Sequence, residues 1–395
     1  MINPLYEERG AADPLPNLSR EEILRYSRHL ILPEVGIEGQ KKLKKSKVLL
    51  VGAGGLGSPA GLYLAAAGVG SIGFVDHDRV EPSNLQRQIL HGTADVGRLK
   101  TDSARDAVLR INPNARVSGY DVSLNSANAL EILKTFDIIV DGSDNFATRY
   151  LINDACALLG KPDVYGAVYR FTGQAAVFDA RRGACLRCLM PEAPTPEEAQ
   201  NCGEGGVLGV LPCIVGGILA AEVIKLVLGA PSTLINRYLT FDAWTMRFHT
   251  FSLDKKPSCP LCGDHPEIME PVDYERFCGI NGKQEEDAAC AQITPTQLKN
   301  LLDTGADIQI IDVRFPEELK ISVLPGSVCI PLQKIGESMG LLDPARDAVL
   351  VCKKGEKSLT AAFLLREEGY RGRLLNLKGG LNAWAKEIDP SIPVY

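Results

Sequence analysis

Four cysteines form two C-x-x-C pairs whose residue type and spacing could hold a metal ion. Cys185 and Cys188 make the first pair, and Cys259 and Cys262 make the second. Four thiolates suit the tetrahedral coordination of Zn²⁺, whereas a single C-x-x-C pair is also typical of a redox site. Because two such pairs are present, we favour a structural zinc site over thiol–disulfide exchange.

Cys352 lies in a sequence context that favours sulfur chemistry. It follows the apolar run 348–351 and opens the segment Cys352-Lys353-Lys354-Gly355-Glu356-Lys357, after which a helix is expected near Ser358. Such a loop directs backbone N–H groups and a helix N-terminus at the sulfur, which lowers the thiol pKa and stabilises a persulfide anion. The lysines add positive charge. A core cysteine at a strand end is the alternative, and the lysines and glycine of this segment count against it.

The other cysteines carry weaker signals. Cys202 lies in the glycine-rich run 201–206, where a loop thiol could attack an activated acyl group to form a thioester, take part in a mixed disulfide, or be a bystander. The odd total of 11 cysteines, without a secretion signal, argues against a disulfide scaffold. Five cysteines have no neighbouring pattern and are assigned to packing: Cys156, Cys213, Cys278, Cys290 and Cys329.

A glycine-rich motif between a predicted strand and a predicted helix indicates a nucleotide site. Gly52-Ala53-Gly54-Gly55-Leu56-Gly57 matches G-x-G-x-x-G, and Asp76 ends the next predicted strand. Glycines allow the backbone to approach phosphate closely, the helix N-terminus attracts the anion, and the acid can bind ribose hydroxyls. The motif alone also suits an NAD-dependent oxidoreductase, or a tight turn without a ligand.

The residues that follow separate adenylyl transfer from hydride transfer. The run Ser83-Asn84-Leu85-Gln86-Arg87-Gln88 comes soon after the second strand, Lys100 follows, and Asp141-Gly142-Ser143-Asp144-Asn145 ends a later strand. Two cations and a carboxylate near a nucleotide suit neutralisation of a triphosphate and binding of Mg²⁺. A hydride-transfer enzyme needs a nicotinamide pocket instead, so the set favours ATP over NAD.

The elements that must position these residues alternate in type. Predicted strands at 48–51, 71–76 and 136–141 are separated by predicted helices at 56–67 and 101–110, and a capping box at Ser19 starts a helix near the N-terminus. Further along, strands at 308–313 and 348–351 alternate with helices at 294–303 and 358–368. The pattern predicts an α/β chain, with a Rossmann-like ATP-binding domain on a parallel sheet and a second, small α/β domain.

Four segments are predicted along the 395 residues: an N-terminal extension (1–18), the first α/β domain (19–263), a linker (264–292) and the second α/β domain (293–395). The net charge of -6 does not favour nucleic acid or an anionic membrane as a partner. Two uncharged stretches, 48–75 and 205–221, are interrupted by glycine and proline, so we expect buried segments rather than membrane spans. A cytoplasmic location is expected.

The first domain resembles the MoeB/ThiF family of adenylyltransferases, which are related to ubiquitin-activating enzymes. The resemblance covers about residues 19–263 and rests on Arg25-Tyr26-Ser27-Arg28-His29, the glycine motif, and the runs 83–88 and 141–145. Besides the phosphate contacts expected of Gly52, Gly54 and Gly57, it implies ATP contacts at Gly55, Asp76, Ser83, Asn84, Leu85, Gln86, Arg87, Lys100, Asp144 and Asn145.

The same resemblance implies roles and partners. Arg87, Lys100 and Asp144 would serve catalysis, with Asp144 as the Mg²⁺ ligand, and Arg28 would reach the ATP site of the other subunit in a homodimer. The two cysteine pairs stand where the family holds zinc. The expected reaction is attack by the C-terminal glycine carboxylate of a ubiquitin-like sulfur-carrier protein on the α-phosphorus of ATP, which releases pyrophosphate and leaves an acyl-adenylate.

The second domain, about residues 293–395, resembles rhodanese sulfurtransferases. The segments 311–314, 324–326 and 379–384 fit that pattern. Val323 stands where a His is common, Lys353 and Lys357 stand where Arg is common, and Glu356 adds a negative charge. Lys lacks the forked geometry of Arg, so the preferred sulfur donor and the rate are left open.

As a whole, the chain resembles MoeZ-type fusions of a MoeB-like adenylyltransferase with a rhodanese domain. Joining the two raises the effective concentration of persulfide near the adenylate. A Cys352 persulfide would attack the acyl-adenylate, and a thiol such as Cys202 would then release a thiocarboxylate. Thiosulfate or a cysteine desulfurase would supply the sulfur. The pathway of the carrier stays open between molybdopterin, thiamin, cysteine and tRNA thiolation.

Two other functions remain compatible with the sequence. One is an activating enzyme that ends at a Cys202 thioester for protein conjugation. The other is a binding scaffold with a degenerate rhodanese domain.

Overall fold

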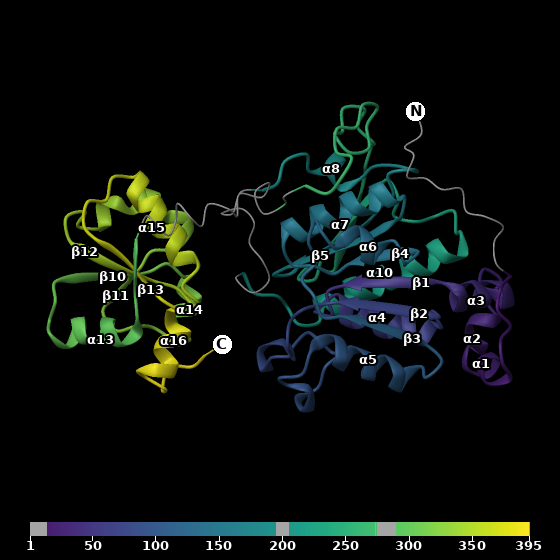
Figure 1. Cartoon of the computed structure of the whole chain (residues 1–395), viewed down its shortest axis with the longest axis horizontal. Coiled ribbons are helices and arrows are strands. Elements are labelled where there is room, and N and C mark those ends of the chain that lie inside the picture. Colours follow the sequence, from purple (N-terminus) through teal and green to yellow (C-terminus); the bar gives the residue numbers. More distant parts are fainter. Residues whose placement is uncertain (1–13, 195–204, 273, 275–289, 395) are drawn as a thin grey trace. The chain divides into compact units, whose positions relative to one another are not determined.

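The chain folds into two compact units, residues 1–278 and 279–395, drawn in Figure 1. The computed structural model describes residues 14–194, 205–272, 274 and 290–394. The predicted site residue Cys202 lies outside the described residues, as does Cys278. Each unit has its own β-sheet, and the predicted combination of a Rossmann-like domain with a small α/β domain is confirmed.

An eight-stranded sheet forms the centre of the first unit, in the order β3-β2-β1-β4-β5-β6-β7-β8. Because β1 pairs with both β2 and β4, the strand order reverses there, and open parallel sheets bind ligands at such a switch point. The parallel strands are β1 (Lys47–Val51), β2 (Ser71–Val75), β3 (Arg116–Tyr120), β4 (Ile138–Asp141) and β5 (Asp163–Tyr169). An antiparallel edge follows with β6 (Thr172–Phe178), β7 (Arg237–Asp242) and β8 (Arg247–Ser252).

Helices cover both faces of this sheet, because its central strands are apolar on both sides. In β1, Val48 and Leu50 pack into one core with α4 (Gly57–Ala67), α5 (Lys100–Ile111) and α10 (Leu211–Leu228). Leu49 and Val51 pack into the opposite core, beside α6 (Ala129–Leu133) and α7 (Phe146–Leu159). A strand buried on both faces in this way is typical of parallel sheets.

The helix α10 overlaps one of the two uncharged stretches. Among the described residues it is the one helix that is long and apolar enough, by length and composition, to cross a membrane. In this fold it packs against α4, β5 and β6. Leu211, Val215, Leu219 and Val223 are buried in the core on that side of the sheet. Its buried face is therefore part of the first unit.

Short helices precede the sheet: α1 (Arg20–Arg25), α2 (Ser27–Leu30) and α3 (Gly36–Lys45). The predicted capping box is present, since Glu22 N donates to Ser19 Oγ and Ser19 N donates to Glu22 Oε2. Tyr26, between α1 and α2, is buried, and its hydroxyl accepts a hydrogen bond from Asn112 Nδ2 at 2.8 Å. This contact holds the start of α2, and with it Arg28, against the end of α5.

A five-stranded parallel sheet forms the second unit, in the order β11-β10-β12-β13-β9. Its strands are β9 (Ala291–Ile293), β10 (Ile308–Asp312), β11 (Ser327–Cys329), β12 (Asp347–Val351) and β13 (Leu374–Leu377). One face packs against α15 (Lys357–Glu367), and the other packs against α13 (Pro295–Asp303) and α16 (Gly380–Glu387). The strands and helices predicted for this unit agree with these bounds to within one residue at each end.

Two described residues within the segment predicted as a linker, 264–292, make contacts with the two units. Tyr274 is buried, and its hydroxyl donates to Asp154 Oδ2 on α7 at 2.8 Å, so the chain up to this residue belongs to the first unit. Cys290 is buried in the core of the second unit, directly before β9. The mixture of Pro, Gly and charged residues indicates the absence of regular elements, but it carries no information on tertiary contacts.

Candidate nucleotide, metal and cysteine sites

A pocket lies at the carboxyl ends of β1, β2 and β4, at the point where the strand order reverses. Separate loops contribute to it, among them those that follow β1, β2 and β4, and only the order of the strands brings those loops together. Eight of the predicted nucleotide residues line the pocket: Gly52, Gly54, Gly55, Asp76, Arg87, Lys100, Asp144 and Asn145.

The first loop runs from β1 to α4 and requires glycine at two points. Gly52 has a φ of +95°, which L side chains rarely adopt, and a Cβ there would lie 3.0 Å from Gly142 O. A Cβ on Gly57, the first residue of α4, would lie 1.9 Å from Gly52 O. The loop therefore turns tightly onto the helix. The N-terminal end of α4 faces the pocket, where the free N–H groups and the helix dipole favour an anion.

Asp76 and Lys100 stand side by side at the end of β2 and the start of α5. Asp76 Oδ2 accepts a hydrogen bond from Ala53 N at 2.9 Å, which ties β2 to the glycine loop. Lys100 Nζ lies 2.8 Å from Asp78 Oδ2 and 3.9 Å from Asp76 Oδ2, and its side chain is only 7% exposed. The ammonium group is thus fixed beside the pocket, with Asp78 as a partner that a phosphate could replace.

The segment after β2 brings a cation and an amide to the pocket. Arg87 lines it and donates from Nη1 to Ser83 O at 3.1 Å. Gln88 also lines it, and this buried side chain has an Oε1 without a hydrogen-bond partner among the described residues. Five residues predicted to contact ATP are not among those that line the pocket: Gly57, which starts α4, and Ser83, Asn84, Leu85 and Gln86. Residues 83–86 form the turn, beginning with the short helix η1 (Pro82–Asn84), that positions Arg87.

The third loop joins β4 to α7. Asn145 caps α7, because its Oδ1 accepts a hydrogen bond from Thr148 N at 2.8 Å. Asp144 precedes it, lines the pocket and is exposed. Carboxylate and phosphate oxygens are the ligands that Mg²⁺ prefers in nucleotide sites. The position and chemistry of Asp144 fit the predicted role of Mg²⁺ ligand.

Other lining residues were not singled out from the sequence. Arg149, one turn into α7, donates to Ser143 O and to Tyr165 OH at 3.1 Å each. Its spacing of four residues from Asn145 is a signal that could have found it, because such residues share a helix face. Residues 122–124, which follow β3, also line the pocket. They carry no sequence signal, since only the strand order β3-β2-β1 brings them there.

The four paired cysteines lie together in a geometry that fits zinc. Their Sγ atoms are 3.9 Å apart for Cys185 and Cys188, 3.6 Å for Cys185 and Cys259, and 3.4 Å from Cys262 to either Cys185 or Cys188. Four sulfurs bound tetrahedrally at ~2.3 Å from a zinc ion stand about 3.8 Å apart. All four side chains are buried. The donor type, spacing and burial therefore suit a structural Zn²⁺ site.

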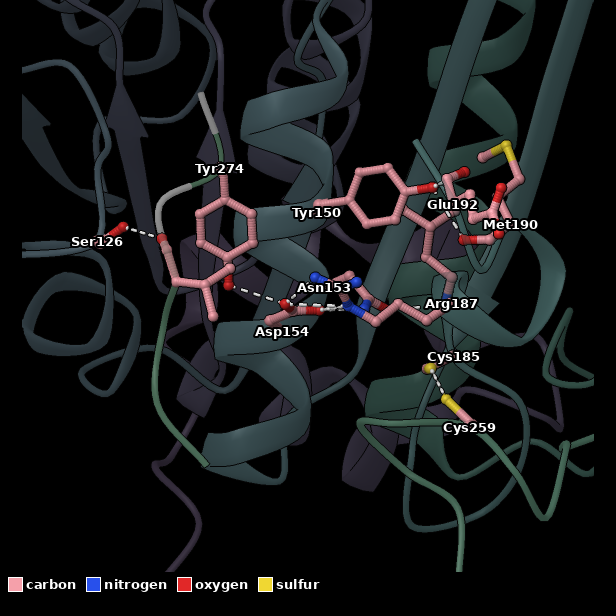
Figure 2. A network of polar contacts seen from close by, with 12 residues as sticks. Ser126, Tyr150, Asn153, Asp154, Cys185, Arg187, Met190, Glu192, Cys259 and Tyr274 are labelled. Carbon is pink, nitrogen blue, oxygen red and sulfur yellow. Dashed lines mark hydrogen bonds and ion pairs between the residues drawn. The ribbon is translucent and has the colours of Figure 1, made fainter. Parts of the chain in front are cut away.

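Arg187, inside the first cysteine pair, is the centre of a buried polar network on α7, shown in Figure 2. It donates to both oxygens of Asp154 at 2.7 and 2.9 Å, and neither side chain is more than 2% exposed. Tyr274 donates to the same carboxylate, and Leu186 N donates to Asn153 Oδ1 at 2.7 Å. The network joins the cysteine cluster to the segment through which the chain leaves the first unit.

Three further contacts lie on the two sides of this network (Figure 2). Tyr150 OH lies 2.9 Å from the carbonyl oxygens of Met190 and Glu192, which follow the first cysteine pair. On the other side, Ser126 Oγ donates to Val272 O at 2.5 Å. The helix that begins at the nucleotide pocket therefore also anchors the chain after the first cysteine pair and the chain around Tyr274.

Cys352 follows β12 and is enclosed by a loop that donates to its sulfur. Its Sγ accepts hydrogen bonds from Gly355 N at 3.1 Å and Ser358 Oγ at 3.2 Å. Gly355 has a φ of +91°, and its carbonyl accepts from Asn376 Nδ2 at 2.9 Å, which fixes the loop to β13. The helix α15 begins next to the loop, at Lys357. Such N–H and O–H groups, together with a helix N-terminus, stabilise a sulfur anion.

The charged residues around the Cys352 loop differ in exposure and in their contacts. Lys354 and Glu356 are exposed, and Lys357 Nζ lies 5.7 Å from the centre of the Phe315 ring. Arg314 is buried and paired with Asp312 at 2.7 Å. It therefore supports the end of β10 rather than serving as an exposed cation beside the sulfur.

Comparisons with known proteins assign a family to each unit. A model of the ThiF family matches residues 26–261, which is more than half of the chain. The chain belongs to the ThiF family. A model of the rhodanese-like domain matches residues 294–387, within the second unit.

ThiF-family relatives with the same two-part organisation cover nearly the whole chain. A probable adenylyltransferase/sulfurtransferase MoeZ of Mycobacterium tuberculosis is 47% identical over 97% of this chain and 98% of its own length. The adenylyltransferase and sulfurtransferase MOCS3 of Drosophila virilis is 42% identical over 98% of this chain and 89% of its own length. The chain is accordingly an adenylyltransferase with a sulfurtransferase domain.

A solved structure supports the ThiF fold. Escherichia coli MccB superposes with a TM-score of 0.55 at 24% identity, covering 61% of this chain and 73% of the MccB chain. At this identity the likeness concerns the fold alone.

Two further residues predicted from the sequence, Arg28 and Cys202, are not placed in the pocket. Arg28 is exposed on α2 and is not among the residues that line the pocket of its own chain. Cys202 belongs to the segment 195–204, outside the described residues.

Proposed function

We propose that this enzyme activates the C-terminal glycine carboxylate of a ubiquitin-like sulfur-carrier protein with ATP and converts it to a thiocarboxylate. The observation that carries the proposal is the presence, in one chain, of a nucleotide pocket at the β1 switch point and a cysteine enclosed by sulfur-directed donors. An acyl-adenylate and a transferable sulfur are the two reactants that such a conversion needs.

The first step is adenylyl transfer in the pocket. A carboxylate oxygen of the carrier attacks the α-phosphorus of ATP, the bond to the β-phosphate oxygen breaks, and pyrophosphate leaves. Lys100 and Arg87 lie beside the glycine loop and neutralise the phosphate charge that builds up, and Gln88 offers its amide N–H groups. Bound Mg²⁺, held by Asp144, would supply further neutralisation of the triphosphate.

The second step is sulfur transfer to the activated carboxyl. Thiosulfate, as the simplest donor, gives its outer sulfur to the Cys352 thiolate, so sulfite leaves and a persulfide forms. The terminal persulfide sulfur attacks the acyl carbon, AMP leaves, and an acyl disulfide joins the carrier to Cys352. A second thiolate then attacks Cys352 Sγ, which releases the carrier thiocarboxylate and leaves a protein disulfide for an external thiol to reduce. We assign that thiolate to Cys202.

The assembly and location follow from the same proposal. An exposed Arg28 that does not line the pocket of its own chain suits a contact with the pocket of a second subunit in a homodimer. The proposal also includes structural zinc in the cysteine cluster. It further includes a cytoplasmic location, where thiols stay reduced.

The proposal is tested by intact mass spectrometry of a Gly-Gly-ended ubiquitin-like carrier incubated with enzyme, Mg-ATP, a thiol reductant and thiosulfate. We expect the carrier mass to increase by the replacement of one oxygen by sulfur. The Cys352→Ala enzyme should still release pyrophosphate, because adenylyl transfer precedes the sulfur step, but it should not replace the carrier's oxygen by sulfur. Cys329→Ala is the matched control, because this half-buried cysteine of the same unit lies outside the Cys352 loop, and it should behave like the wild type.

Other outcomes point to other functions. A carrier–enzyme thioester that accumulates regardless of Cys352 would favour activation for protein conjugation. Absence of AMP formation with every Gly-Gly-ended carrier tried would overturn the proposal.

A further inference from the structure

His91 is a buried histidine that sequence reasoning passed over and that does not line the nucleotide pocket. Its ring contacts two elements of that pocket. Nε2 lies 3.0 Å from Ala53 O, in the glycine loop, and Nδ1 lies 2.8 Å from Ser103 Oγ, on α5. Both contacts span long stretches of sequence, so the ring joins parts of the site that are otherwise separate.

The chemistry of the two partners assigns the tautomer. A carbonyl oxygen only accepts hydrogen bonds, so Nε2 must carry the proton that is donated to Ala53 O. In the neutral ring, Nδ1 is then the acceptor, and the Ser103 hydroxyl donates to it. Burial lowers the pKa of His91 below its ordinary value, with the Lys100 charge adding to this, while the hydrogen bond to Ala53 and the charges of Asp76 and Asp95 oppose it. A neutral ring at pH 7 agrees with one donor and one acceptor nitrogen.

Ala53 is the residue through which this contact acts on the phosphate-binding loop. Its N–H is already fixed by Asp76 Oδ2 at 2.9 Å. Its carbonyl shares a planar, trans peptide unit with the N–H of Gly54, so the direction of one group sets the direction of the other. Gly54 lines the pocket, whereas His91 lies behind the loop. By holding the Ala53 carbonyl, His91 orients the Gly54 N–H on the opposite side of the peptide.

The Ser103 contact ties the same ring to the cationic side of the pocket. Ser103 lies three residues after Lys100 on α5, close to the same helix face. His91 itself lies three residues after Gln88. The glycine loop, the Arg87–Gln88 segment and the helix that starts with Lys100 therefore meet at one imidazole ring.

We propose that His91 is a positioning residue for adenylyl transfer, which fixes the peptide between Ala53 and Gly54 so that the glycine loop presents its N–H groups to the ATP phosphates. The inference rests on the adenylyl-transfer half of the proposed function. It assigns to His91 no contact with ATP and no proton transfer.

Two substitutions distinguish the contact made by Nε2 of His91 from the contact made by Nδ1. His91→Gln places an amide N–H donor close to the position of Nε2 and can keep the bond to Ala53 O. His91→Asn places its amide close to the position of Nδ1, which can keep the bond to Ser103 but does not reach Ala53 O. Both lose one contact and part of the ring volume, so a purely structural role predicts similar defects in the two variants.

The readouts are binding of the Mg²⁺ complex of α,β-methylene-ATP, measured by calorimetric titration, and release of pyrophosphate from ATP with a Gly-Gly-ended carrier. We expect His91→Gln to bind the analogue within about threefold of wild type, and His91→Asn to lose about tenfold or more in affinity and in kcat/KM for ATP. Thermal unfolding is measured for both. Ser103→Ala, which spares the Ala53 contact, should stay close to wild type and serves as a third variant if His91→Asn fails to fold.

Equal losses in His91→Gln and His91→Asn that follow their melting temperatures would overturn the proposal. So would a Ser103→Ala defect in analogue binding as large as that of His91→Asn. Failure of the wild-type enzyme to bind the analogue would instead overturn the adenylyl-transfer function on which the inference rests.

Discussion

Asp163, at the start of β5, is buried with both carboxylate oxygens lacking a hydrogen-bond partner among the described residues. Burial raises the pKa of Asp163 well above its ordinary value, and the charge of Asp141 adds to the rise while Arg149 opposes it. The side chain therefore stays protonated in the folded chain at a pH where it is ionised in the unfolded chain.

This residue makes the stability of the first unit dependent on pH. Folding takes up a proton at Asp163 between its ordinary pKa, about 3.9, and its raised pKa in the fold, so wild-type stability falls as pH rises through that window. The loss is at most about 1.4 kcal/mol per pH unit. Asp163→Asn has no proton to release, so it lacks this loss. Its free energy of unfolding, relative to that of the wild type, should therefore be higher at pH 8 than at pH 5. Urea unfolding followed by circular dichroism at both pH values measures the difference.

Asp179 provides a matched control for this prediction. It is equally buried but is paired with Arg182 at 2.7 Å, so Asp179→Asn should destabilise the fold at both pH values. A difference between wild type and Asp163→Asn that does not change with pH would show that Asp163 keeps its ordinary titration.

At the same scale, the sequence identifies residues that adjoin the ends of strands and misses those that act through tertiary contacts. Gly52, Asp76 and Asp144 are recognisable because each stands where a parallel strand ends. Arg149 is marked in the sequence only by its spacing from Asn145, and His91 belongs to no motif and becomes visible only when its hydrogen-bond partners are known. Side-chain burial and backbone contacts, rather than spacing, decide the role of such residues.

At the scale of elements, α7 organises the first unit around the cysteine cluster. Tyr274→Phe removes the hydrogen bond to Asp154 and keeps the buried ring, while Tyr150→Phe removes the contacts with the carbonyl groups of Met190 and Glu192. Loss of a hydrogen bond that contributes about 1 kcal/mol raises the equilibrium constant for local opening roughly fivefold. We expect Tyr274→Phe to accelerate amide hydrogen exchange at residues 268–274 by about that factor, and Tyr150→Phe to do so at 188–192.

Each variant is the control for the other, because both lose one phenol hydroxyl from the same network. Exchange that increases equally at both segments in both variants would mean that the network opens as a unit. Unchanged exchange at 268–274 in Tyr274→Phe would show that the hydroxyl does not anchor this segment.

The bounds of elements with a clear apolar pattern could be predicted closely, as for α5 (101–110 expected) and β12 (348–351 expected). The antiparallel edge β6–β8 was not predicted. Its outer strand β8 is exposed along its whole length, so it lacks the apolar run that marks a buried strand. The contact of Tyr274 with Asp154 could not be predicted either, because it depends on folding and not on local sequence.

At the scale of the whole molecule, each unit has its own hydrophobic core, so loss of metal should affect one unit alone. We expect a strong zinc chelator to lower the melting temperature of the first unit in differential scanning calorimetry. Transfer of sulfur from thiosulfate to cyanide by the second unit should stay unchanged. Cys259→Ser should reproduce the effect of the chelator and contain less than one zinc per chain by metal analysis.

Cys213→Ser is the matched control, because this half-buried cysteine of the first unit lies outside the cluster. It should keep full zinc content. Stoichiometric zinc in Cys259→Ser, or a chelator that leaves the first transition unchanged, would contradict the assignment of the cluster.

The spacing of the cysteine cluster has a consequence for the unfolded chain. Cys185 and Cys259, whose sulfurs are 3.6 Å apart, are separated by 74 residues, so a bound ion would close a long loop that contains α10, β7 and β8. In the chain-entropy treatment of a cross-link, closing a loop of this length removes on the order of 4 kcal/mol of conformational freedom from the denatured ensemble. The cluster would thus act as a reversible cross-link. Its contribution to stability depends on the availability of the metal and not on the oxidation of a disulfide.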